Sequence, residues 1–131
     1  MAFTLPINVR YLEVDQQGVV FNMWYLAYMD DAMTGLLAHG GLPYLEMLDA
    51  GYDVQVVHTE LDWRGSLRFG RPASVVAGLE HVGTTSFTIG FELRDGDAVA
   101  ASGRTTYVTV ATDGTGKIGI PDRLRAALTK P

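Results

Sequence analysis

The stretch that decides the fold is EVDQQGVVFNMWYLAYMDDA, residues 13–32. A carboxylate, Asp15, lies in the polar turn DQQG, and the apolar run VVF leads from this turn to Asn22. Asn22 is a favourable helix N-cap, and the apolar side chains that follow recur at three- and four-residue spacing. This spacing predicts a helix over residues 23–39, which the glycine pair Gly40-Gly41 closes. The stretch therefore places an ionisable group just ahead of a helix start.

Outward from this stretch, the segment PYLEMLDAG indicates a second short helix with Pro43 at its first position. Residues 3–11 are predicted to form a first strand, with Pro6 near an edge or a bulge. After the helices the sequence becomes rich in residues that favour strands, and turn signals separate these strand-like segments. Strands are predicted over residues 52–69, 73–82, 84–95 and 98–112, and a short terminal helix over residues 121–131.

The order of these elements predicts the fold class. One strand and a long helix are followed by four strands in apparent hairpin succession, which favours a single α+β domain over residues 1–131. An antiparallel sheet needs one face covered, and the long helix is the main element available to cover it. We therefore expect a five-stranded antiparallel sheet that curls around this helix.

Composition excludes several classes of protein. The 131 residues are 47% hydrophobic, which is enough for a core, and they contain no cysteine that could form a disulfide or bind a metal. The three histidines are scattered, so no zinc site is predicted, and neither is a cofactor. The net charge of −5 argues against a nucleic-acid-binding surface. No apolar run is long enough for a membrane span and no secretory signal is recognisable, so a cytoplasmic protein is expected.

The motif around Asp15 resembles the hotdog-fold acyl-CoA thioesterases of the 4-hydroxybenzoyl-CoA thioesterase family. The similarity covers nearly the whole chain in element order and is concentrated in RYLEVDQQGVVFNMWYLAYMDDA. The matching positions are Arg10, Asp15, Gly18, the apolar trio Val19-Val20-Phe21, Tyr25 and Asp30. Two positions depart from the family pattern. Gln16-Gln17 stand where a Pro-Ala pair is frequent, and Gly70-Arg71-Pro72 where Gly-Asp opens the third strand.

The resemblance implies a hotdog fold and hydrolysis of an acyl-CoA or acyl-carrier-protein thioester. Asp15 would be the nucleophile or the general base, and the N–H at Asn22 would stabilise the oxyanion. The chemistry fits, because a carboxylate can attack a thioester or activate water, and a helix start presents unpaired N–H groups and a positive dipole end. Asp30 and Asp31, on the helix, could be a solvated pair, a support to the catalytic acid, or the catalytic acid itself, and one of them must lean toward the sheet.

Further residues are candidates for contact with substrate. Gly18 allows the turn that brings Asp15 back toward the helix, and Tyr25 could line an acyl or aryl pocket or pack in the core. His58 shares a strand face with Glu60 and Asp62 and could touch ligand or belong to a polar surface. Arg64, Arg68 and Arg71 form the main basic cluster of an acidic chain. They could hold the phosphates of coenzyme A or form a solvated strand end.

Two other functions remain open from the sequence. One is a non-catalytic module that binds acyl-CoA or acyl carriers. The other is a hotdog hydratase or dehydratase, a class that usually relies on a histidine with an aspartate. A homodimer or homotetramer is expected. In this family two sheets join edge to edge. In addition, a single helix is expected to be too small to cover the whole apolar surface, which includes the face of Phe87, Ile89, Phe91 and Leu93.

Overall fold

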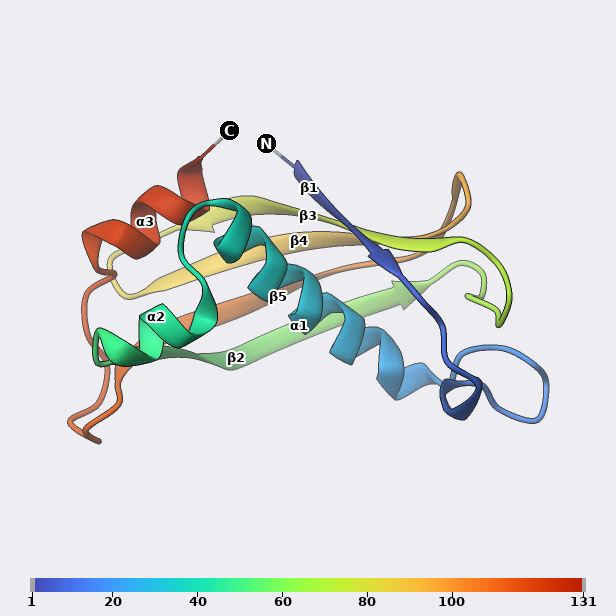
Figure 1. The fold of residues 1–131 in the computed structure, drawn as a ribbon, viewed down its shortest axis with the longest axis horizontal. Helices are drawn as coiled ribbons and strands as arrows, with labels where there is room; N and C mark the ends of the chain where they lie inside the picture. The colour runs from blue at the N-terminus through green and yellow to red at the C-terminus, as the bar shows by residue number, and fades with distance from the viewer. Residues whose placement is uncertain (1, 131) are drawn as a thin grey trace.

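The computed structural model of the protein describes residues 2–130, which form one sheet wrapped along a long helix (Figure 1). The strands are β1 (Ala2–Ile7), β2 (Tyr52–Trp63), β3 (Ala73–Val82), β4 (Ser86–Asp95) and β5 (Ala98–Ala111). The helices are α1 (Asn22–His39), α2 (Tyr44–Asp49) and α3 (Asp122–Thr129), and a 3-10 turn, η1, covers Tyr11–Glu13. This is the arrangement that the sequence predicts for the hotdog fold.

The sheet is antiparallel and has the order β1-β3-β4-β5-β2. The prediction of four strands in hairpin succession is wrong in one respect, because β2 pairs with β5 at the far edge and does not pair with β3. The connection over residues 64–72 crosses the end of the sheet. It is held there by a bridge between Val19 and Arg68 and by the Val20 N–H, which donates to the Leu67 carbonyl at 2.9 Å.

Strand β2 also ends earlier than the sequence predicts. The N–H groups of Arg64 and Gly65 both donate to the carbonyl of Ala100, at 2.8 and 2.9 Å, and this shared acceptor turns the chain out of the ladder. The expected strand over residues 52–69 is therefore a strand over Tyr52–Trp63 followed by a loop. This loop lies next to the turn that carries Asp15.

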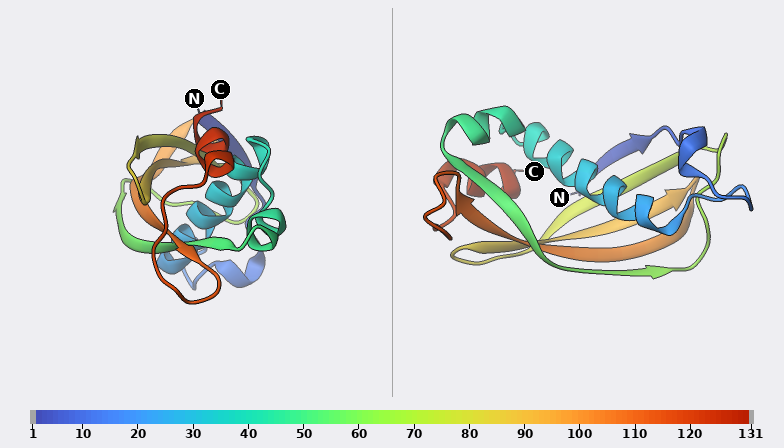
Figure 2. Two further views of the ribbon diagram at one scale, coloured as in Figure 1. Left: turned by 90° about the vertical axis from the view of Figure 1, so that its left-hand side faces the viewer. Right: turned by 90° about the horizontal axis from the view of Figure 1, so that it is seen from below.

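Helix α1 lies along the concave face of the sheet, and Figure 2 shows the strands curving around it. Its buried side chains are Tyr25, Tyr28, Met29, Ala32, Met33, Leu36 and Leu37. The apolar face of β4 faces this helix, and Phe87, Ile89, Phe91 and Leu93 are all at most 4% exposed. The expectation that these β4 residues leave an uncovered patch is therefore wrong, since a single chain buries them.

The exposed apolar side chains lie elsewhere. Among the largest are Phe21, Met23, Leu26, Val56, Val57 and Trp63, between 43% and 59% exposed. They belong to the start of α1 and to the edge strand β2. Part of the uncovered apolar surface is thus at the β2 edge of the sheet, beside the start of α1, and Tyr11, Leu12 and Leu45, at 61% to 80% exposure, lie outside this region.

The ends of α1 differ slightly from the expected ones. Asn22 is the first helical residue and Phe21 is the N-cap, with no side-chain cap, so the prediction of Asn22 as the N-cap is wrong by one position. The C-terminal end is closed as predicted. Gly41 has φ +97°, and the N–H groups of Gly41 and Leu42 donate to the carbonyls of Ala38 and Leu37. Pro43 is likewise the N-cap of α2 and not its first residue.

Two kinds of feature are missing from residues 2–130. No helix in this range has the length and apolar composition needed to cross a membrane. The same residues contain no group of three or more histidine, cysteine, aspartate or glutamate side chains arranged to hold a metal ion.

Candidate active site

Asp15 lies at the tip of a small hairpin that precedes α1. Val14 bridges to Val20, the Asp15 N–H donates to the Val19 carbonyl at 2.8 Å, and the Gly18 N–H donates to the Asp15 carbonyl at 3.0 Å. Gly18 has φ +77°, a left-handed conformation that favours glycine, so this residue permits the turn. The hairpin fixes the backbone of Asp15 close to the start of α1.

The side chain of Asp15 is only partly engaged by its own loop. Its Oδ1 accepts the Gln17 N–H at 2.8 Å, which is a local turn contact. Oδ2 accepts no hydrogen bond from the described residues. One carboxylate oxygen is thus oriented by the turn, and the other has no hydrogen-bond donor within residues 2–130.

The start of α1 offers two unpaired donors. The Phe21 N–H donates to the Glu13 carbonyl at 2.9 Å and the Trp24 N–H to the Phe21 carbonyl at 3.0 Å. Between them, the N–H groups of Asn22 and Met23 have no acceptor within residues 2–130. Together with the positive end of the helix dipole, they form a place where negative charge on an oxygen would be stabilised.

An apolar groove opens beside this helix start, between α1 and β2. It has a volume of about 390 Å³ and is lined by Phe21, Asn22, Met23, Leu26, Thr59, Glu60, Leu61 and Trp63. Leu26 and Thr59 also line a second hollow of about 310 Å³ further along the helix. The groove therefore offers a mostly apolar surface that begins at the helix start.

Sequence reasoning did not identify the β2 side of this groove. Thr59, Leu61 and Trp63 alternate along β2 after an irregularity between Val56 and His58, and this alternation directs them toward α1. The signal was present in the alternation of residues 59–63. Only the pairing of β2 at the far edge of the sheet, however, places those side chains next to the helix start.

Asp30 lies at the far end of the second hollow. The buried Tyr107 hydroxyl donates to Asp30 Oδ1 at 3.2 Å, so one acid of the Asp30-Asp31 pair leans toward the sheet, as predicted. Burial and the neighbouring Asp30 carboxylate hold the pKa of Tyr107 above its usual value, so the hydroxyl stays protonated. Partial burial and the charge of Asp30 also raise the pKa of Asp31.

Tyr25 is buried directly behind the site. Its side chain is 1% exposed, and its hydroxyl accepts the Leu67 N–H at 3.0 Å. It also contacts the Trp63 ring edge-on, with the ring centroids 5.9 Å apart. This placement ties the 64–72 loop to α1 and supports the wall of the groove, while the ring itself is shielded from the groove opening.

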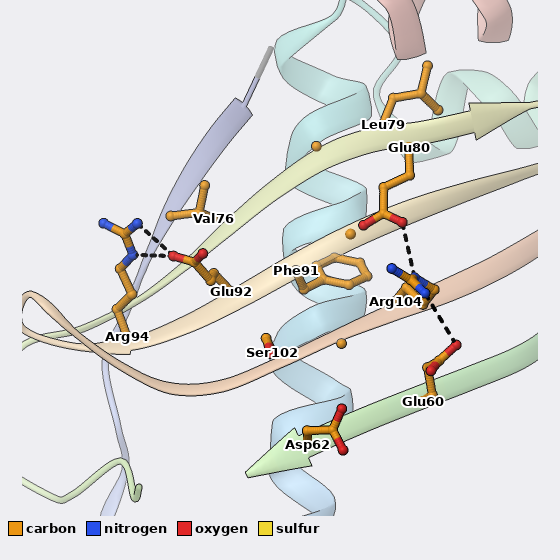
Figure 3. Close-up of a pocket in the computed structure, with 13 residues that line it drawn as sticks. Glu60, Asp62, Val76, Leu79, Glu80, Phe91, Glu92, Arg94, Ser102 and Arg104 are labelled. Carbon is orange, nitrogen blue, oxygen red and sulfur yellow. Dashed lines mark hydrogen bonds and ion pairs between the residues drawn. The ribbon is translucent and has the colours of Figure 1, made fainter. Parts of the chain in front are cut away.

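His58 is not brought to this groove. It is exposed and lies 3.4 Å from Glu60, which together with Asp62 lines a hollow of about 490 Å³ on the outer face of the sheet. Figure 3 shows that hollow, where two arginines lie among four acids. Arg104 pairs with Glu80 at 3.0 Å, and Arg94 with Glu92 at 2.6 Å. His58 is thus absent from the lining of the groove.

The three arginines of the basic cluster have different surroundings. Arg71 donates through Nε to Asp95 Oδ1 at 2.8 Å, so its charge is already paired. Arg64 and Arg68 are exposed and form no ion pair with the described residues. Arg68 also bridges to Val19 on the Asp15 hairpin. The structure therefore brings Arg68 next to the candidate site and leaves Arg71 engaged elsewhere.

A known protein family matches nearly the whole of this chain. The family model of the thioesterase-like superfamily matches residues 9–128. The chain belongs to the thioesterase-like superfamily. The match includes the Asp15 hairpin, all of α1 and the strands that line the groove.

One curated relative of this thioesterase-like chain is a protein of Bacillus subtilis (strain 168), provisionally named as the acyl-CoA thioesterase YneP. It is 34% identical over 74 residues, which are 56% of this chain and 54% of the relative. The chain thus spans about half the length of the curated relative that it matches.

Solved structures confirm the hotdog fold of this superfamily member. A hypothetical protein from Thermus thermophilus superposes with a TM-score of 0.88 at 29% identity, covering 97% of this chain and 95% of that one. A hypothetical protein from Aquifex aeolicus gives a TM-score of 0.91 at 25% identity, over 96% and 98%. A 1,4-dihydroxy-2-naphthoyl-CoA thioesterase from Synechocystis shares the fold with a TM-score of 0.89 at 19% identity, over 99% and 97%.

Proposed function

We propose that the protein hydrolyses an acyl-CoA or acyl-carrier-protein thioester to the free acid and the thiol. The observation that carries the proposal is the pairing of one oriented carboxylate, Asp15, with two free N–H groups at the start of α1, those of Asn22 and Met23. Membership of the thioesterase-like superfamily and the provisional name of the Bacillus subtilis relative support the same reaction.

The proposed reaction starts with the thioester carbonyl at the helix start. Its oxygen accepts hydrogen bonds from the Asn22 and Met23 N–H groups, which stabilise the negative charge that develops during attack. The Asp15 carboxylate either attacks the carbonyl carbon or removes a proton from an attacking water. Direct attack expels the thiolate and leaves a mixed anhydride, which water then hydrolyses. General-base attack gives the acid and the thiol in one addition and elimination.

The acyl group is proposed to lie in the groove between α1 and β2. The lining of this groove by Phe21, Met23, Leu26, Leu61 and Trp63 favours an apolar acyl or aryl group. Gly18 and Tyr25 act on the shape of the site, Gly18 through the turn and Tyr25 through the loop that it anchors. His58 receives no part in this proposal, because it lies on the outer face.

The nucleotide end of coenzyme A is proposed to contact Arg64 and Arg68. Both arginines are exposed and form no ion pair in the described chain, and the guanidinium group suits phosphate oxygens. Arg71 contributes less than the sequence led us to expect, since binding a phosphate would compete with its contact to Asp95. The reaction is proposed to take place in the cytoplasm, on the sequence grounds given above.

A homodimer, or a homotetramer built from it, is the proposed working unit. Strand β2 is an edge strand, and residues 55–60 along it are all exposed. An unpaired and apolar strand edge is a template for pairing with another strand. Two copies joined through β2 would cover Val56 and Val57 and would place a partner chain over the open side of the groove.

Purified protein tested against short, long and aromatic acyl-CoA thioesters, and against carrier-protein thioesters, decides whether the chain is an enzyme. Release of free thiol from at least one of them is expected. Tight binding of a non-hydrolysable analogue without any turnover would favour the non-catalytic binding module. Hydration of an enoyl thioester without thiol release would favour the hydratase, although no histidine lies beside Asp15 in the structure.

A further inference from the structure

Glu13, two residues before Asp15, is the most buried carboxylate in the described chain, with 3% of its surface exposed. It lies at the end of the 3-10 turn η1, and its side chain is surrounded by donors. Oε1 accepts the Arg10 N–H at 2.9 Å and the Tyr28 hydroxyl at 2.8 Å. Oε2 accepts Nε and Nη2 of Arg10 at 3.0 and 2.8 Å. No part of the proposed reaction uses this group directly.

The contacts of Glu13 connect the strand that carries Asp15 to helix α1 at two points. The Glu13 carbonyl accepts the Phe21 N–H at 2.9 Å, which fixes the residue just before the helix. The Glu13 side chain accepts the hydroxyl of Tyr28, which lies within α1. Both links bracket the Asn22 and Met23 N–H groups, so they set the position of the hairpin relative to those donors.

The electrostatics favour an ionised Glu13. Burial raises the pKa of this carboxyl, but the hydrogen bonds from the Arg10 N–H, from Tyr28 and from the Arg10 guanidinium outweigh burial and hold the pKa below its usual value. Burial and the hydrogen bond to Glu13 raise the pKa of Tyr28, so the tyrosine stays a donor. Arg10 is held in turn over the Trp24 ring, with its Cζ 5.7 Å from the centroid.

We propose that Glu13 and Tyr28 are positioning residues, which hold the Asp15 carboxylate in register with the Asn22 and Met23 N–H groups. The inference rests on the proposed function, because it assigns a role in that reaction. Misplacing a reacting group by about 1 Å can cost about 100-fold in rate. Loosening this link should therefore affect the chemical step much more than the binding of the remote parts of the substrate.

The test compares Glu13→Gln and Tyr28→Phe with the wild type on the best thioester of the panel. Both variants should lower kcat by about 10- to 100-fold and leave KM within about threefold, since the groove and the arginines are unchanged. The double variant should be no slower than Glu13→Gln alone, because the two side chains act as one unit. A stability control is Leu128→Val in α3, where Leu128 is buried and lies outside the hydrogen-bond network of Arg10, Glu13 and Tyr28.

A second measurement does not depend on activity. Amide hydrogen exchange should become faster over residues 14–21 in Glu13→Gln and Tyr28→Phe, and it should stay at the wild-type rate there in Leu128→Val. Unchanged kcat in both folded variants, or a loss that Leu128→Val reproduces, would overturn the proposal. So would wild-type exchange over residues 14–21 in both variants. Absence of turnover in the wild type would remove the proposed function as well, whereas an active wild type with unaffected variants removes only this role.

Discussion

Asp15, Asn22 and Glu13 show how far single residues could be assigned from sequence. The motif gave Asp15 and the helix start, and the structure adds which N–H groups there are free. Asn22 is one position inside the helix, because Phe21 provides the cap without any side-chain bond. Glu13 was not singled out, since a single glutamate just ahead of the polar turn DQQG carries no sign of burial. Its donors, Arg10 and Tyr28, are identified only once η1 packs on α1.

The buried Glu13 should make stability depend on pH in a defined direction. A carboxyl whose folded pKa lies below its ordinary value of 4.5 stabilises the fold above that value, and this stability is lost as the pH falls through the folded pKa. Urea unfolding should therefore show Glu13→Gln less stable than the wild type by about 1–3 kcal/mol at pH 7. The difference should shrink below about pH 4. A constant difference from pH 7 to pH 3 would show that ionisation of Glu13 is irrelevant.

Arg68 and Arg71 should behave differently in spite of their proximity in sequence. Arg68→Glu should raise KM for acyl-CoA several-fold with little change in kcat, because a remote contact gives mainly uniform binding. Arg71→Glu should raise KM less, since the wild-type side chain is engaged by Asp95. The KM difference should fall at high salt. Equal KM values for the wild type and Arg68→Glu, measured at low salt, would remove the proposed phosphate contact.

At the scale of elements, the helix and most strands were predictable from periodicity. Residues 73–82 form a strand with the predicted bounds, and α1 begins within one residue of its expected start. Strand β2 was placed wrongly, since local patterns state that a segment is extended but not which strand it pairs with. The position of β2 in the sheet depends on the 64–72 loop. Long-range hydrogen bonds, such as that between Val20 and Leu67, hold this loop across the end of the sheet.

Tyr25 anchors this loop, and removing its hydroxyl should be costly. Tyr25→Phe leaves the Leu67 N–H buried without an acceptor, which should destabilise the fold by about 1–3 kcal/mol. The matched control is Tyr52→Phe, because the Tyr52 hydroxyl is buried and has no partner within residues 2–130. Its removal should be close to neutral. Chemical unfolding of both variants measures the difference, and equal losses in the two would contradict the anchoring role.

For the whole molecule, the sequence predicted the hotdog arrangement but placed the uncovered apolar surface on β4. That prediction was wrong because the apolar side chains of α1 and the curvature of the sheet suffice to bury Phe87, Ile89, Phe91 and Leu93. A run of exposed apolar side chains lies instead along β2 and the helix start, with Phe21, Met23, Val56, Val57 and Trp63 between 48% and 59% exposed. Which strand forms the edge of a sheet is a property of topology, so no local pattern could have located it.

The position of this surface leads to a prediction about assembly. Val57 is 59% exposed on the edge strand, and Val57→Lys should weaken the proposed pairing of two copies through β2. Light scattering at micromolar concentration should give a mass of two or four chains for the wild type and a lower mass for the variant. Lys130→Glu, near the C-terminus and away from β2, serves as a charge control. A monomeric wild type with full activity at nanomolar concentration would end the dimer proposal.

The most direct test of the central claim, that the Asp15 carboxylate carries out the chemistry at the start of α1, compares two aspartates in similar turns. Asp113 also accepts the N–H two residues ahead, at 2.9 Å, but it belongs to the turn that follows β5, and that turn lies at the end of the sheet opposite the hairpin before α1 (Figure 1). Asp15→Asn should lower kcat for thioester hydrolysis by about 10²- to 10⁴-fold while binding of a non-hydrolysable acyl-CoA analogue persists, and Asp113→Asn should match the wild type. Wild-type turnover by Asp15→Asn would contradict the account.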